Sequence, residues 1–195
     1  MKRLHRTDLF CWSAFREPLN IDFNSTLWVR PEGNVLIDPL PMSAHDKAHL
    51  NELGGAAIVV ITNSMHVRAA GEHSGAKVCG PRAEQGVFAA TRWLADGEEV
   101  VPGLVAYELE GSKTPGELCL VLDGTTLITG DLVRSHRADT LTLLKPEQNL
   151  KSRDAALASI RRVRELNPKL EHVIVGDGWH CFSRAKVLLD ELLQG

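Results

Sequence analysis

The chain has 195 residues, of which 44% are apolar and 24% charged, so it has the composition of a soluble globular protein. Its length favours a single domain over residues 1–195. A net charge of −3 and an aromatic content of 5% disfavour a protein that binds nucleic acid through bulk charge or base stacking. No apolar run is long enough to span a bilayer and no secretory signal pattern is present. We therefore expect a cytoplasmic protein with neither nucleic-acid nor membrane partners.

Eight histidines and four cysteines raise the hypothesis of a metal site, which their positions have to test. The cysteines are far apart in sequence, without the pair spacing of a zinc ribbon, and are expected to be reduced, buried thiols. His45 and His49 are four residues apart and would share a helix face, but that helix is short and charged. We therefore expect these two histidines on a solvated helix rather than at a metal.

The predicted elements of the first half are strands, a hairpin and short helices. Ser43 precedes alanine, leucine and charged residues at helical spacing and is the expected N-cap of its helix. A continuous β-branched run at 56–61 is typical of a strand covered on both faces. In chain order the predictions are a hairpin at 26–30 and 34–37, a helix at 43–53, a strand at 56–61, a helix at 66–73, a strand at 77–79 and a helix at 82–90.

The second half has a different pattern, with turn residues separating short strands. This spacing predicts an antiparallel meander, followed by the longest helix of the chain and a last strand and helix. The arginines of the long helix are expected on its solvated face. The predicted strands are 99–101, 105–109, 118–122, 126–129 and 172–175, and the predicted helices are 151–166 and 183–193. Strands and helices thus alternate throughout, which indicates sheets covered by helices.

Polar residues follow several of these buried strands directly. The segment 63–68 follows the strand at 56–61, Asp131 follows 126–129, and Asp177 follows 172–175. Because polar residues after buried strands tend to gather in one crevice, we expect these segments to form a site. A glycine-containing segment at 111–117 lacks the residue order of a phosphate-binding loop, and its proline removes an N–H that such a loop needs.

Taken in order, these segments resemble the metallo-β-lactamase superfamily. Residues 61–68 (ITNSMHVR) lie where that family has its HxHxDH loop, and 110–116 (EGSKTPG) is similar to its GHTPG loop. Residues 127–131 (LITGD) match its strand ending in Gly-Asp, and 175–178 (VGDG) resembles its GHG loop. The resemblance covers about residues 20–195. It implies an α/β fold of the α+β type, a four-layer αβ/βα sandwich with the site along one edge.

The family binds two metal ions, usually zinc, and its ligand positions are largely altered here. Carried over one by one, those positions hold Asn63, Met65, Val67, Arg68, Lys113, Asp131 and Asp177. Asp131 alone keeps the family identity, whereas Arg68 and Lys113 are cations where a cation should bind. His66 lies one residue out of register. The resemblance therefore implies a degenerate metal-binding motif, and we expect no metal and no other cofactor.

The charges of these side chains balance without metal. Arg68 and Lys113 would offset Asp131 and Asp177, and two further divalent ions would leave uncompensated buried charge. If the protein is an enzyme or a binder, Arg68 and Asn63 are expected to bind an anionic small molecule together with Lys113. Lys113 would act as an acid or base, with Asp131 or Asp177 as partner and His66 as the group titrating near neutrality.

Two other functions stay open. The charged cluster would be purely structural in a pseudoenzyme, whose surface then serves protein association. Alternatively, the protein is an active metal-dependent hydrolase with a reduced, single-ion zinc site. The sequence identifies neither the ligand nor the oligomeric state, and a homo-oligomer is compatible with it.

Overall fold

The computed structural model describes residues 1–195, except for the side chain of Glu147. Its larger sheet has seven strands in the order β1-β2-β3-β4-β5-β6-β7. The pairs from β1 to β4 are antiparallel, and those from β4 to β7 are parallel. The strands are β1 (Lys2–Arg3), β2 (Leu9–Arg16), β3 (Ile21–Trp28), β4 (Val35–Ile37), β5 (Ile58–Val60), β6 (Lys77–Pro81) and β7 (Arg92–Leu94).

The second sheet has five strands in the order β14-β11-β10-β9-β8. The expected meander is confirmed, because β8 to β11 pair antiparallel in sequence, while β14 joins β11 in parallel. The strands are β8 (Glu98–Val101), β9 (Leu104–Glu108), β10 (Leu118–Leu122), β11 (Thr126–Thr129) and β14 (His172–Val175). A small ribbon of β12 (Val133–Arg134) and β13 (Thr142–Leu143) follows β11.

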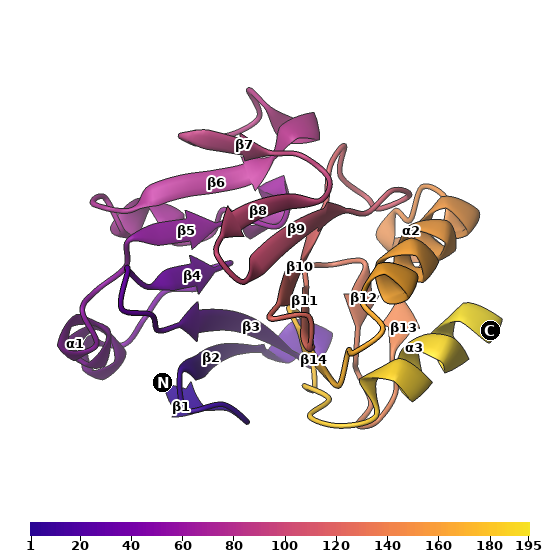
Figure 1. The fold of residues 1–195 in the computed structure, drawn as a ribbon, viewed down its shortest axis with the longest axis horizontal. Helices are drawn as coiled ribbons and strands as arrows, with labels where there is room; N and C mark the ends of the chain where they lie inside the picture. The colour runs from indigo at the N-terminus through magenta and orange to yellow at the C-terminus, as the bar shows by residue number, and fades with distance from the viewer.

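The two sheets lie face to face between helices, which confirms the expected four-layer sandwich (Figure 1). β10 shows why, since all five of its residues are buried and alternate between two cores. Leu118, Leu120 and Leu122 face the larger sheet, whereas Cys119 and Val121 face α2 (Arg153–Leu166) and α3 (Ala185–Gln194). α1 (Ala44–Glu52) covers the far side of the larger sheet through Leu50.

Most predicted elements are confirmed, but two predicted helices are wrong. The segment 66–73 forms only two 3₁₀ turns, Ser64–His66 and Ala70–Glu72, since Arg68 between them has a left-handed backbone with φ of 40°. The segment 82–90 forms one such turn, Arg82–Glu84, followed by Gly86 at a φ of 89°. A left-handed residue ends a right-handed helix, so neither segment can continue as one.

Strands β2 and β7 were not among the sequence predictions. β2 pairs with β3 along its full length and extends the larger sheet toward the N-terminus. The expected N-cap is confirmed, because Ser43 Oγ accepts a hydrogen bond from the Asp46 backbone N–H at 3.1 Å. All four cysteines are buried. In the part of the chain that the structure describes, no helix has both the length and the apolar character needed to cross a membrane.

Candidate functional site

The candidate site lies where strands of both sheets end. Asp38 follows β4, residues 61–68 follow β5, Asp131 follows β11 and Asp177 follows β14. The loop between β9 and β10 adds a side chain from the second sheet. These elements bring together all six candidate residues of the sequence analysis, namely Asn63, His66, Arg68, Lys113, Asp131 and Asp177.

Asp131 is the centre of this group and is 3% exposed. Its Oδ2 accepts from Lys113 Nζ at 2.9 Å and from Asn63 Nδ2 at 3.1 Å. Its Oδ1 lies 3.5 Å from His66 Nε2. Burial by itself would raise the pKa of Asp131, but His66 and Lys113 outweigh burial and hold the pKa well below its usual range. Asp131 is therefore a carboxylate whose negative charge is compensated by side chains.

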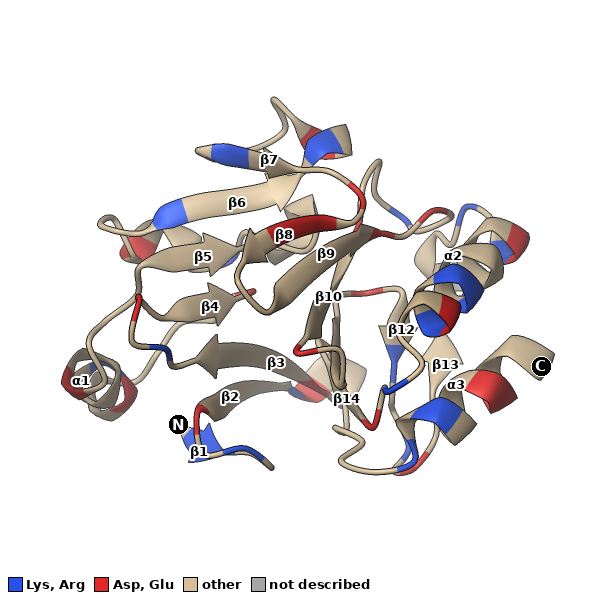
Figure 2. Ribbon diagram, viewed as in Figure 1, with Lys and Arg blue, Asp and Glu red and all other residues tan. Residues whose placement is uncertain are grey.

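Arg134 is a second buried cation beside Asp131, and the sequence analysis did not find it. It is 4% exposed and its Nη2 lies 3.3 Å from Asp131 Oδ1 and 3.2 Å from Asp177 Oδ2. Its Nε and Nη2 also donate to the backbone oxygen of Asp131 at 3.0 and 2.9 Å. Arg134 lies on β12, the short strand labelled beside β13 in Figure 2. Arg134 belongs to none of the family motifs, so only its contacts identify it.

Asp38 organises the loop after β5 and was also missing from the predicted site. Its Oδ1 accepts from the Thr62 backbone N–H at 2.8 Å, and its Oδ2 accepts from the Thr62 hydroxyl at 2.6 Å. The same Oδ2 lies 2.6 Å from His66 Nδ1. A carboxylate bonded to one ring nitrogen fixes the orientation of a histidine, so Asp38 directs His66 Nε2 toward Asp131. Its place at the end of a buried strand was the available sequence signal.

His66 is 2% exposed and lies between two carboxylates. Burial alone would lower its pKa, but Asp38 and Asp131 outweigh burial and raise the pKa of His66 to about 10. Arg68 Nη2 also lies 3.0 Å from His66 Nε2, a contact that suits only an unprotonated nitrogen. We regard the imidazolium as the stable form at neutral pH, because two carboxylates face the ring and Arg68 has other acceptors.

Arg68 is anchored on several sides. Its Nη1 donates to the backbone oxygen of Asn24 at 3.1 Å, and its guanidinium lies over the Phe23 ring at 5.3 Å. Its Nη2 reaches to 4.0 Å from Asp177 Oδ1. That oxygen is buried, and among the residues that the structure describes it has no hydrogen-bond partner. Burial raises the pKa of Asp177, against the opposing effect of Arg134.

Glu117 supports the site from beneath and was not predicted. It is fully buried, its Oε2 accepts from the Ser112 hydroxyl, and its Oε1 accepts from the Leu132 backbone N–H at 2.6 Å. Burial and the nearby Asp131 raise the pKa of Glu117 to about 7. Ser112 precedes Lys113, and Leu132 follows Asp131. Glu117 therefore links the two loops whose side chains form the Lys113–Asp131 ion pair.

A cavity of about 470 Å³ opens onto this group. One part of its wall is apolar and the other charged. The residues around it are Ala14, Arg16, Phe23, Leu40, Pro41, Met65, His66, Arg68, Lys113 and Asp131. Arg16 is exposed at the end of β2, and no sequence motif indicated its place at this cavity. Met65 is 62% exposed, while Val67 packs against the α1-side core.

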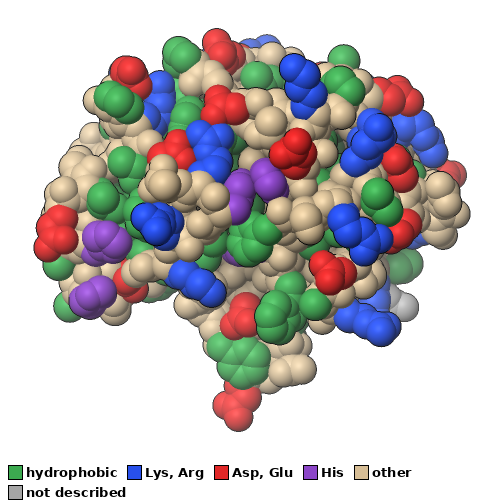
Figure 3. Space-filling model, turned by 60° about the horizontal axis from the view of Figure 1, so that its bottom comes forward, with side chains coloured by type: hydrophobic (Ala, Val, Ile, Leu, Met, Phe, Trp, Pro, Cys, Tyr) green, Lys and Arg blue, Asp and Glu red, His purple; other side chains and the backbone are tan. Residues whose placement is uncertain are grey.

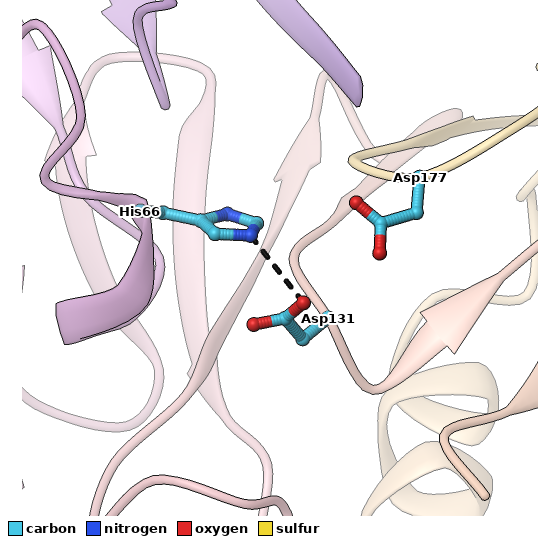
Figure 4. A group of neighbouring side chains, drawn as sticks. All are labelled: His66, Asp131 and Asp177. Atoms are coloured by element: carbon cyan, nitrogen blue, oxygen red, sulfur yellow. Dashed lines mark ion pairs between the residues drawn. The ribbon is translucent and has the colours of Figure 1, made fainter. Parts of the chain in front are cut away.

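Three side chains of the candidate site are of the types that could hold a metal ion. One ligand atom each of His66, Asp131 and Asp177 lies within 4.8 Å of the others. Figure 4 shows the imidazole of His66 pointing toward Asp131, with Asp177 entering from another loop. Both carboxylates already contact Arg134, however, and Asp131 also contacts Lys113.

Comparison with known proteins identifies the fold family. The family model described as metallo-beta-lactamase superfamily matches residues 1–195. Similar solved structures include the DIM-1 metallo-β-lactamase, at 15% identity and a TM-score of 0.76 over 98% of this chain and 95% of that one. A metallo-β-lactamase from Pontibacter korlensis has 17% identity and a TM-score of 0.75 over 97% and 96%. The mono-zinc form of FIM-1 from Pseudomonas aeruginosa has 14% identity and a TM-score of 0.75 over 100% and 94%.

No curated protein sequence matches the chain. At these identities the solved structures establish the fold alone. The match of the family model over the whole chain, together with the sandwich and its edge site, shows that this chain belongs to the metallo-β-lactamase superfamily.

Proposed function

We propose that the protein binds a small anionic molecule in a pocket where side-chain cations have taken the place of metal ions. The observation that carries this proposal is the ion pair of Lys113 Nζ with Asp131 Oδ2 at 2.9 Å. Lys113 stands at a position where the family has a metal-binding histidine, and Asp131 at that of its bridging aspartate. An ammonium group thus neutralises the carboxylate that would otherwise hold metal.

The arrangement of charges does not suit a resident divalent ion. Arg134 contacts both Asp131 and Asp177, and His66 is held as a cation between Asp38 and Asp131. A metal ion would have to displace these groups or lie within a few ångströms of several positive charges. At an effective dielectric constant of 20, even one unit charge 4 Å from another costs about 4 kcal/mol. A metal ion needs neutral or negative ligands, and the two carboxylates that could serve are already paired with cations.

The cavity favours an anion with an apolar part. Arg16, Arg68 and Lys113 line it, whereas Asp131 is the carboxylate in its wall and is already paired. Guanidinium and ammonium groups bind carboxylate and phosphate through charge-assisted hydrogen bonds. Phe23 and the neighbouring apolar side chains would contact the rest of the molecule. The ligand class is therefore an aromatic or aliphatic carboxylate or phosphate ester.

The same residues define what chemistry the pocket supports. Lys113 and Arg68 would stabilise negative charge that develops on a bound group, and Lys113 is the cavity side chain that could donate a proton to it. A hydrolase-like reaction is thus within reach of these side chains. A pseudoenzyme that only binds the anion uses the same contacts, and measurements of turnover distinguish the two.

One observation favours a second candidate function, hydrolysis assisted by a single metal ion. His66, Asp131 and Asp177 offer three ligand atoms within 4.8 Å of one another. The contacts of Arg134 and Lys113 with the two aspartates weigh against this candidate, and the following experiment separates the two functions.

The test uses chelator-treated protein and phenyl phosphate as the probe, with phenol as its neutral counterpart. Isothermal titration should detect phenyl phosphate but not phenol, and the affinity should fall as salt concentration rises. Arg16→Gln should weaken binding several-fold without altering the buried ion pairs, because Arg16 is exposed. Arg3→Gln is the matched control, since Arg3 is an exposed arginine on β1, outside the cavity lining.

Binding of phenyl phosphate that requires added zinc would instead support the metal-dependent candidate. Failure of phenyl phosphate, benzoate and hexanoate to bind under both conditions would overturn the proposal of an anion-binding pocket. Equal affinities of the wild type, Arg16→Gln and Arg3→Gln would place binding elsewhere on the molecule.

A further inference from the structure

Arg134 occupies a special position among the cations of the site. Arg68 and Lys113 line the cavity, whereas Arg134 is 4% exposed and is absent from its wall. A ligand in the cavity therefore meets Arg68 and Lys113 first, and Arg134 acts behind them. Arg134 therefore acts through the protein groups that it contacts rather than by binding a molecule from solution.

The guanidinium joins the two aspartates that come from different strands. Nη2 is 3.3 Å from Asp131 Oδ1 and 3.2 Å from Asp177 Oδ2. Asp131 follows β11 and Asp177 follows β14, so a single nitrogen connects the loops after two neighbouring strands. Two buried carboxylates this close would repel one another without a cation between them. Nη2 thus has the contacts that a bridging cation would have.

The backbone keeps Arg134 in this position. Nε and Nη2 both donate to the Asp131 backbone oxygen, which gives the guanidinium a two-point attachment independent of the carboxylates. Arg134 itself lies on β12, which pairs with β13 through Thr142. A planar guanidinium fixed at both its strand and its head cannot simply swing aside to admit an ion.

We propose that Arg134 is the built-in cation of this site, and that it occludes a latent metal site formed by His66, Asp131 and Asp177. This inference rests on the proposed metal-free pocket but is distinct from anion binding there. It makes Arg134 a positioning residue, because it acts through the two aspartates. An uncharged side chain at 134 should leave two carboxylates without a cation between them, and a divalent ion that binds there would release the ring proton of His66.

The three groups are of the type that binds Zn²⁺ or Co²⁺. Imidazole nitrogen and carboxylate oxygen are common ligands of these metals, and three protein ligands leave a coordination position open. The buried Asp177 Oδ1 has no hydrogen-bond partner among the described residues and only a long contact of 4.0 Å with Arg68 Nη2, so it is the oxygen that could ligate the ion. Asp38 would hold the imidazole in place from behind.

The experiment compares Co²⁺ binding by the wild type, Arg134→Met and Arg134→Lys. Arg134→Met removes the charge but keeps an unbranched apolar chain, whereas Arg134→Lys keeps a cation and is the matched control. Co²⁺ titration should produce visible ligand-field absorption in Arg134→Met at one equivalent, with an affinity on the order of 100-fold above that of the wild type. Arg134→Lys should resemble the wild type.

The double variant Arg134→Met/Asp177→Asn should lose the gained absorption, which locates the ion at this site. If Arg134→Met folds poorly without metal, added Zn²⁺ should raise its melting temperature, and Arg134→Gln provides a second uncharged variant. Folded Arg134→Met and Arg134→Gln that take up no Co²⁺ would overturn the latent site. Wild-type binding within threefold of Arg134→Met would show that Arg134 does not occlude it.

The outcome is separable from that of the proposed function. If the wild type does not bind phenyl phosphate, the proposed anion pocket is refuted, but the Co²⁺ result of Arg134→Met is unaffected. Conversely, a protein that binds phenyl phosphate without metal but gains no Co²⁺ site in the Arg134 variants would refute this inference alone.

Discussion

His66 and a separate group of three histidines lie in opposite electrostatic environments. His66 is buried between Asp38 and Asp131, and these carboxylates raise its pKa to about 10. His5, His172 and His180 gather with Phe182, where the rings of His5 and His172 are 4.0 Å apart. There burial lowers the pKa of His180 to about 4, with further contributions from Lys2 and His5. Figure 3 shows one face of the molecule with histidine side chains near its middle.

Neighbouring charge, more than burial, decides the charge of a buried histidine in this protein. Both His66 and His180 lose hydration, which by itself favours the neutral ring. Only His66 has neighbouring carboxylates that offset the lost hydration of the charged ring. The neighbouring carboxylates therefore favour the charged form of His66, whereas burial favours the neutral forms of His5 and His180.

The largest effect is expected from Asp38→Asn. The change keeps the shape and tolerates the left-handed backbone of residue 38, whose φ is 50°. It leaves the imidazolium of His66 with one carboxylate fewer, so we expect a loss of about 3–5 kcal/mol in the free energy of unfolding. Urea denaturation at pH 7 measures this loss. Asp154→Asn, at an exposed position in the first turn of α2, should change the free energy by less than about 0.5 kcal/mol.

The stability of the protein should be sensitive to acid because of His180. The pKa of His180 is about 4 in the folded protein and near 6.5 when unfolded, so the unfolded state binds more protons between these values. The stability contributed by neutral His180 is therefore lost as pH falls from about 6.5 to 4. His180→Gln should reduce that loss by up to about 3 kcal/mol relative to the wild type.

The pH dependence that His66 contributes to stability should have the opposite sign. The folded pKa of His66 is above 6.5, so its contribution is present below pH 6.5 and is lost as pH rises toward about 10. Unfolding free energies between pH 4.5 and 9.5 measure both effects. The contrast fails if His180→Gln follows the wild-type profile on the acid side, or if the wild type gains stability between pH 7 and 9.5.

A smaller effect is expected from Lys113→Met. The Lys113 side chain is 22% exposed, so solvent screens part of its pairing with Asp131. We expect a loss of about 1–3 kcal/mol, between the values for surface and buried ion pairs. Lys77→Met, at an exposed position on β6, is the matched control. An unchanged melting curve for Lys113→Met would mean that Lys113 contributes nothing to compensating Asp131.

The smallest effect is expected from His45→Gln on α1. The His45 side chain is 87% exposed, and its contact with Asp46 is 3.7 Å long. Substitutions at such positions usually change stability by less than about 0.5 kcal/mol. A thermal melt with and without Zn²⁺ should be the same for this variant and the wild type. A zinc-dependent shift that disappears in His45→Gln would reveal a metal site on α1 instead.

Much of the fold was predictable because its signals are local. The continuous apolar run of β10, the turns between β8 and β11, and the sequence motifs of the family are all short stretches of sequence. The predicted helix at 82–90 failed because the chain there bends at Gly86, and Glu84 turns inward to accept a hydrogen bond from Ser64. That contact joins distant segments and has no local signature.

The residues of the candidate site likewise fall into those with a local sequence signal and those without one. The family motifs located Lys113 and Asp131, since each occupies a recognisable position after or between strands. Arg134 and Arg16 follow no motif, and only folding brings them to the two aspartates and to the cavity. Asp38 was visible as the end of the opening hairpin, but its bond to His66 spans 28 residues.

The central claim is that side-chain cations occupy the place of metal in this site. It is tested most directly by zinc analysis of the protein after chelation, zinc resupply and dialysis, in parallel with Asp131→Asn. If cations occupy the site, the wild type retains well below one equivalent of zinc, with no further decrease in Asp131→Asn. One equivalent of zinc in the wild type that is lost in a folded Asp131→Asn would contradict this claim.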